Sequence, residues 1–100
     1  MRYVFMAYHH PRPEHRLALV RWTQRVAAAL RAQPGLLLLG DFDDTANGRI
    51  VALSVWESKT QFESGWKAAL DSLNDEPPYD LWEARPLEVI AGNELEMPNG

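Results

Sequence analysis

Three short segments of this chain are apolar on both alternations of a β-strand, and this feature limits the possible folds most strongly. Residues 2–9 carry Tyr3 and Phe5 on one alternation and Val4 and Met6 on the other, and residues 36–42 and 49–57 are similarly apolar. Strands of this kind are covered on both faces in the folded protein. The chain must therefore supply, or recruit, a layer of cover on each side of its sheet.

The segments between these strands provide two amphipathic helices. Residues 14–33 follow Pro11 and Pro13 and place large apolar residues at helical spacing, and the helix ends at Pro34 and Gly35. A second helix begins at Ser58, since Ser58 and Gln61 have the spacing of a capping box. The apolar stripes consist of Leu19, Trp22, Val26 and Leu30 in the first helix and Phe62, Trp66, Ala69 and Leu73 in the second.

The remaining segments complete a recognisable element order. Asn47 and Gly48 form the turn of a hairpin between the second and third strands, because this dipeptide tolerates positive φ. Residues 74–80 form a loop and residues 81–90 a fourth strand, in which Pro86 indicates an edge or a bulge. The order predicts an α+β, ferredoxin-like βαββαβ domain with a four-stranded antiparallel sheet over residues 1–91, and a polar tail over residues 92–100.

Two helices can cover only one face of such a sheet. The other face would expose a contiguous apolar surface that is unusual for a monomer. A second copy packed sheet against sheet would cover it, so the sequence predicts a homodimer.

Composition narrows the classes of partner and chemistry. The formal net charge of −4 argues against a nucleic-acid partner, and the absence of cysteine excludes disulfides and thiolate chemistry. The N-terminus lacks the long apolar core of a signal peptide, and no apolar run approaches the length of a membrane span. We expect a cytoplasmic protein with no membrane partner.

The stretches "PGLLLLGDF", "RIVALSVWES" and "TQFESGWKAAL" together resemble the antibiotic biosynthesis monooxygenase family over roughly residues 2–90. The resemblance implies a dimeric α/β barrel whose protomers each hold a pocket between helices and sheet. It also implies oxidation of aromatic or polyketide-like phenols by O₂ without flavin or metal, and other members degrade haem. We therefore expect a small apolar or aromatic ligand and no cofactor.

The resemblance carries Trp66 over as a pocket residue, although "FESGW" has one residue more between Phe62 and Trp66 than the family pattern. Trp66 and Phe62 are equally compatible with a purely structural core stripe. We expect Trp22, Tyr8 and Phe62 to join Trp66 in the pocket wall. For Trp56, packing at the dimer interface is the simpler interpretation.

Polar residues near the strand ends are candidates for the chemistry. His9 or His10 could remove a phenolic proton, and because neighbours on a strand point to opposite faces, only one of them can enter a pocket. The alternative is a pair of half-solvated histidines, and a metal site using these histidines is not expected. Arg85 is a candidate to stabilise an oxyanion and Tyr79 to hold the phenol, but Arg85 could instead form an exposed ion pair with Glu83.

Two absences argue against haem degradation. In the family that this chain resembles, the haem-degrading branch has an asparagine in the first strand and a histidine after the helix tryptophan. Here the first strand has no asparagine, and residues 67–76 contain no histidine to bind iron. The sequence thus favours a cofactor-independent monooxygenase. A non-catalytic ligand-binding dimer and a related isomerase or cyclase are the alternatives.

Overall fold

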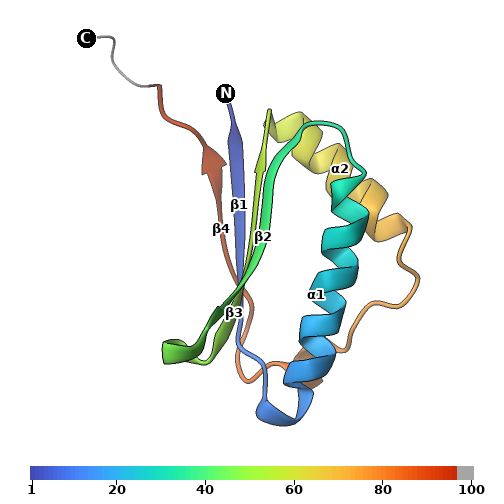
Figure 1. The fold of residues 1–100 in the computed structure, drawn as a ribbon, viewed down its shortest axis with the longest axis vertical. Coiled ribbons are helices and arrows are strands. Elements are labelled where there is room, and N and C mark those ends of the chain that lie inside the picture. Colours follow the sequence, from blue (N-terminus) through green and yellow to red (C-terminus); the bar gives the residue numbers. More distant parts are fainter. Residues whose placement is uncertain (97–100) are drawn as a thin grey trace.

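The computed structural model describes residues 1–96, and within them the predicted order of strands and helices is confirmed. The sheet has the strand order β2-β3-β1-β4, every neighbouring pair is antiparallel, and both long helices cover the same face (Figure 1). The elements are β1 (Tyr3–His9), η1 (Pro13–His15), α1 (Arg16–Arg31), β2 (Leu36–Asp44), η2 (Thr45–Asn47), β3 (Arg49–Trp56), α2 (Lys59–Asp71), α3 (Tyr79–Trp82) and β4 (Glu88–Asn93).

Helix α1 begins two residues later than the periodicity predicts, because Pro13 starts a separate 3₁₀ turn. Its apolar stripe is buried as expected, and the helix stops before Pro34. Gly35 then adopts a φ of 86°, a conformation that glycine tolerates and other residues rarely adopt. The chain can therefore turn sharply from α1 into β2.

Helix α2 starts at the predicted cap, where the Ser58 side chain accepts a hydrogen bond of 3.2 Å from the Gln61 amide. In the middle of α2, Gly65 lies against the ring of Trp56, which is completely buried. The prediction that Trp56 packs at a dimer interface is thus wrong. Its indole points to the helices, donates to Ser54 Oγ at 2.9 Å, and fits there because Gly65 has no side chain.

The fourth strand is shorter and later than predicted. Pro78 caps the short helix α3, whose last turn places Trp82 against the core and the ring of His15. Pro86 lacks an amide hydrogen and lies in the connection, so β4 begins only at Glu88. The strand then runs to Asn93, two residues into the segment predicted as a tail, and residues 97–100 of that segment lie outside the described residues.

The face of the sheet opposite the helices has no layer over it in the described chain (Figure 1). Pairing register places Val4, Met6 and Tyr8 of β1 beside residues of β3 and β4 on this face, and β2 continues the face beyond β3. Its other apolar members include Leu38, Phe42, Val51, Val55 and Ile90, of which Leu38, Phe42 and Ile90 are more than half exposed. We call this set the open face.

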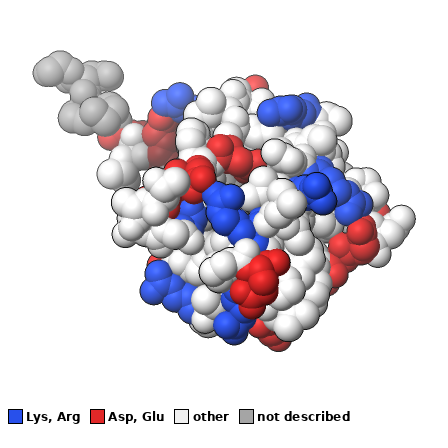
Figure 2. All heavy atoms as spheres, turned by 60° about the horizontal axis from the view of Figure 1, so that its bottom comes forward, with Lys and Arg blue, Asp and Glu red and all other residues white. Residues whose placement is uncertain are grey.

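Charged side chains of both signs alternate over the surface that Figure 2 shows, with no large region of one sign. No helix among residues 1–96 is long and apolar enough to cross a membrane.

Candidate functional site

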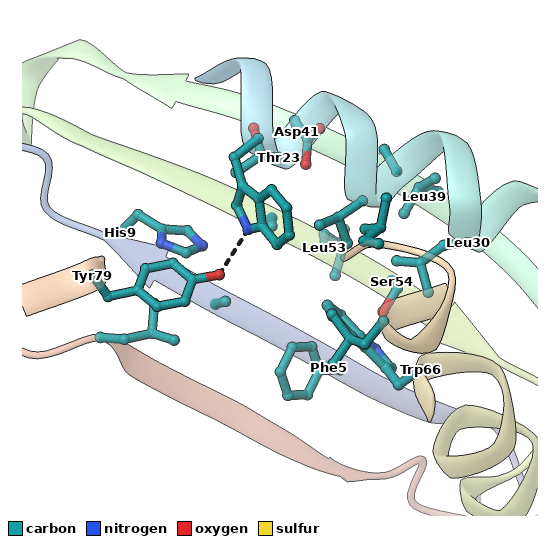
Figure 3. Close-up of a pocket in the computed structure, with 18 of the residues that line it drawn as sticks. Phe5, His9, Thr23, Leu30, Leu39, Asp41, Leu53, Ser54, Trp66 and Tyr79 are labelled. Carbon is teal, nitrogen blue, oxygen red and sulfur yellow. Dashed lines mark hydrogen bonds between the residues drawn. The ribbon is translucent and has the colours of Figure 1, made fainter. Parts of the chain in front are cut away.

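A cavity of about 370 Å³ lies between the helix-covered face of the sheet and helices α1 and α2 (Figure 3). Its volume falls at the small end of the range for ligand pockets. Small residues create this space. Ala7 of β1 and Ala52 of β3 pair directly across the sheet to form the floor, and Ala27 of α1 faces them. A close-packed layer is thus interrupted where large side chains are missing.

Aromatic side chains form one end of the cavity. The rings of Phe5 and Trp66 lie 5.2 Å apart between centroids, in a tilted arrangement (Figure 3). Phe62 stacks on Phe5 from behind at 5.0 Å and does not line the cavity, so the prediction that it contacts substrate is not supported. Phe62 lies behind the cavity wall because, from its place on α2, its ring packs against the rings of Tyr3 and Trp56.

The indole nitrogen of Trp66 is buried and has no hydrogen-bond partner among the described residues. A buried donor without a partner costs about 1–3 kcal/mol. A small adjustment of the ring would be needed to give it a partner. This N–H is therefore a donor that the protein itself leaves unused.

His9 and Glu83 form the opposite, polar end. His9 Nδ1 lies 3.2 Å from Glu83 Oε2, and each residue is only 6% exposed. The other carboxylate oxygen, Oε1, accepts a hydrogen bond of 2.8 Å from the His10 amide, so both oxygens of Glu83 are held. A carboxylate at Nδ1 favours the tautomer with a proton there. Nε2, which has no protein partner among residues 1–96, is then the unprotonated nitrogen of a residue that lines the cavity.

Backbone pairing holds Glu83 in this position although it is far from His9 in sequence. The Ala84 amide donates to the His10 carbonyl at 2.7 Å, and the Arg12 amide donates to the Trp82 carbonyl at 2.8 Å. These bonds form a short antiparallel bridge beyond the end of β1. The carboxylate is consequently fixed by main chain on both sides.

A second hydrogen bond lies beside this pair. Trp22 Nε1 donates to the Tyr79 hydroxyl at 2.7 Å, and the Tyr79 ring stacks on His9 at a centroid distance of 6.3 Å (Figure 3). Burial raises the pKa of Tyr79, with a smaller contribution from the nearby carboxylates of Glu76 and Glu83 and an opposing one from the Trp22 N–H. Tyr79 therefore stays protonated at neutral pH and can donate its own proton to a ligand oxygen.

The structure separates the remaining predicted site residues from the cavity. The Tyr8 ring lies on the open face, where the Arg49 guanidinium sits 4.5 Å above it, so its prediction as a pocket wall is wrong. Arg85 is exposed in the bend before β4 and does not line the cavity, so it cannot stabilise an oxyanion there. Its suggested ion pair with Glu83 is also wrong, because Glu83 is buried against His9.

His10 does not line the cavity either. Its Nε2 lies 2.9 Å from Glu88 Oε1, at the start of β4. Both histidines are nearly inaccessible, at 6% and 5% exposure, so the alternative of half-solvated rings is wrong. No group of three or more histidine, aspartate or glutamate side chains in residues 1–96 could hold a metal ion.

Sequence reasoning placed His9, Trp22, Trp66 and Tyr79 among the candidates, and all four line the cavity. It missed the partner of His9 and the alanine floor. Glu83 gave no signal of its own, because a lone glutamate in a polar stretch resembles a surface residue. Ala7 and Ala52 were visible as small residues within apolar strands, but their pairing depends on strand register.

Together these features define a ferredoxin-like α+β domain with an apolar, partly aromatic cavity between its helices and sheet. No family model and no curated relative matches this chain. Solved structures do match it: Rv0793 from Mycobacterium tuberculosis, at 16% identity and a TM-score of 0.76, covers 99% of this chain and 100% of its own. A putative antibiotic biosynthesis monooxygenase from Nitrosomonas europaea, at 14% identity and a TM-score of 0.71, covers 94% and 99%. The chain therefore has the fold of the antibiotic biosynthesis monooxygenases, as the sequence resemblance predicts.

A mutant of MhuD with two manganese protoporphyrin IX molecules per active site also shares the fold, at 14% identity and a TM-score of 0.69, covering 98% of this chain and 99% of its own. The cavity described here does not fit such a ligand. Asp41 and Glu76 in the lining are acidic, and the lining has no lysine or arginine to pair with porphyrin carboxylates. The small volume adds to this mismatch.

Proposed function

We propose that this chain is a cofactor-independent monooxygenase that oxidises an aromatic phenol to a quinone with O₂. The observation that carries the proposal is the apolar, aromatic cavity that ends at a histidine held by a buried carboxylate. A base beside an apolar cavity of this kind is what proton removal from a flat phenol would require, and this supports the proposal. Several solved structures with this fold are named antibiotic biosynthesis monooxygenases, which adds support.

In the proposed reaction, His9 Nε2 removes the proton of the phenolic hydroxyl, and Glu83 stabilises the imidazolium that forms. The resulting phenolate donates electrons to O₂ and forms a carbon–oxygen bond at the ring. One oxygen atom becomes the new quinone carbonyl. The other leaves as water with two hydrogens, one from the hydroxyl and one from the ring carbon, so one O₂ is consumed for each quinone.

Three other groups would orient the substrate. Phe5 and Trp66 contact the substrate ring at the aromatic end of the cavity. At the polar end the protonated Tyr79 hydroxyl donates to the oxygen that develops negative charge.

We further propose that two copies pair through the open face. Its exposed apolar residues, including Leu38, Phe42 and Ile90, are on the side that the helices leave uncovered. Sedimentation equilibrium should give a dimer at micromolar concentration, and Phe42→Asp should shift it to monomer. A wild-type chain that sediments as a monomer contradicts this assembly.

Oxygen uptake with a panel of naphthols and anthrols tests the function. We expect one O₂ consumed per quinone, and a loss of roughly 10²–10⁴-fold in turnover for His9→Gln, the typical worth of a general base. His15→Gln is the matched control, because its imidazole stacks on Trp82 and does not line the cavity. Full activity in His9→Gln would refute the role of His9.

The other outcomes identify the alternatives. Tight binding of phenols with no oxygen consumption supports a non-catalytic binding protein. Conversion of a phenol or polyketide without O₂ supports an isomerase or cyclase.

A further inference from the structure

The charged residues that line the cavity are both acids. Asp41 of β2 lies next to the cavity floor, because it pairs with Ala52 of β3, which in turn pairs with Ala7 of β1. Glu76 lies in the connection after α2 and also lines the cavity. The lining contains no lysine or arginine, and the view in Figure 3 shows Asp41 at one margin, near Thr23.

Acidic residues close to Asp41 and Glu76 in sequence differ from them in having arginine partners. Two residues along β2, Asp43 pairs with Arg16 at 2.5 Å, and next to Glu76, Asp75 pairs with Arg25 at 2.8 Å. Among the described residues neither Asp41 nor Glu76 forms an ion pair. All four carboxylates are exposed, but the two outside the cavity lining are paired with arginines, whereas the two in the lining have no cation partner among the described residues.

Partial burial also affects the ionisation of Asp41. It raises the pKa of this carboxyl, against the opposing influence of His9 and Arg31. A negative ligand would lose water on entering the cavity, would find no cation, and would lie near two carboxylates. A neutral ring carries none of these costs, and an ammonium group would gain a partner.

We propose that the cavity selects its ligand by charge, and that it binds neutral or amine-bearing aromatic molecules while rejecting anions of the same shape. This inference rests on the proposed function for the position of the ligand and deepens it by naming the substrate class. The natural substrate would then be a phenol or amino-phenol without a carboxylate or sulfonate.

Isothermal titration calorimetry with three probes of one shape tests this selection: naphthol, naphthalenemethylamine and naphthoate, at neutral pH and low salt. We expect naphthoate to bind about tenfold or more weakly than naphthol, and the amine to bind at least as well as naphthol. In Asp41→Asn/Glu76→Gln the naphthoate affinity should rise and the advantage of the amine should fall.

The control is Asp43→Asn/Asp75→Asn, which also removes two negative charges, but from ion-paired positions outside the cavity lining. It should leave the ratio of the three affinities unchanged. The inference is overturned if the affinity for naphthoate is within twofold of the affinity for naphthol. It is also overturned if Asp43→Asn/Asp75→Asn changes the three affinities as much as Asp41→Asn/Glu76→Gln does. If no probe binds, both this inference and the proposed function fail. If the charge ratio holds but no oxygen is consumed, only the monooxygenase proposal fails.

Discussion

Replacing Gly65 by alanine should destabilise this protein, although glycine is normally a poor residue within a helix. A Cβ at position 65 would lie 2.6 Å from Cζ3 and 2.7 Å from Cη2 of Trp56, and 3.3 Å from Cβ of Gln33. Trp56 is completely buried and its ring is held by a hydrogen bond to Ser54, so it cannot move aside freely.

The magnitude follows from two opposing effects. Alanine gains about 1 kcal/mol over glycine in a helix interior. Overpacking a buried site costs about 1–3 kcal/mol, and two contacts this short put the cost near the upper end. The net result is a free energy of unfolding lowered by about 1–2 kcal/mol, which in a domain of this size lowers Tm by several degrees.

Urea denaturation at one fixed protein concentration measures this, with Gly92→Ala as control, since nothing lies within 4 Å of a Cβ at Gly92. The sharper test is Trp56→Phe, because phenylalanine lacks the two ring carbons that clash. In that background Gly65→Ala should stabilise, giving a coupling energy of about 2–3 kcal/mol. A stabilising Gly65→Ala in the wild-type chain would refute the packing described here.

Three further changes test other parts of the structure. Ser58→Ala removes the cap of α2 and should lower the free energy of unfolding by about 1 kcal/mol in urea denaturation; no change would show that the cap is dispensable. Ala52→Leu should fill the cavity floor, leave the far-UV circular dichroism spectrum intact and lower naphthol affinity at least tenfold by calorimetry; unchanged affinity would place the ligand elsewhere. The pKa of Tyr79 is raised in the folded protein, so this residue ionises in the unfolded chain first as pH rises, and the free energy of unfolding should fall above about pH 10. Tyr79→Phe should lessen that fall in denaturation curves recorded across this pH range. An identical fall in both proteins would contradict the raised pKa.

The element order was predictable because it depends on local periodicity. Alternation marks β1, β2 and β3, a capping box marks the start of α2, and Pro34 with Gly35 marks the end of α1. The fourth strand was misplaced because apolar residues on both sides of Pro86 look alike in sequence. Only the structure shows that the first part of this segment ends helix α3 and forms a separate bridge to residues 10–12, outside β4.

The face to which each strand residue points was less predictable. On β3 both alternations are apolar, so periodicity alone could not decide that Trp56 faces the helices and Val55 the open face. The deciding feature is Gly65, which gives the indole its space from a helix elsewhere in the chain. The same limit applied to Tyr8, whose partner Arg49 lies on the neighbouring strand.

The site was predictable only in part for a related reason. Aromatic residues at helical spacing identified Trp22 and Trp66, but the contact between His9 and Glu83 spans 74 residues and depends on tertiary structure. A cavity also depends on where large side chains are absent from neighbouring strands. The pairing of Ala7 with Ala52 became visible only with the strand register.

The most direct test of the central claim is a crystal structure of the protein with a bound naphthol. We expect the ring against Phe5 and Trp66 above the Ala7–Ala52 floor, and the hydroxyl within hydrogen-bond distance of His9 Nε2. A naphthol bound on the open face, or bound in the cavity with its hydroxyl directed away from His9, would contradict the site proposed for this protein.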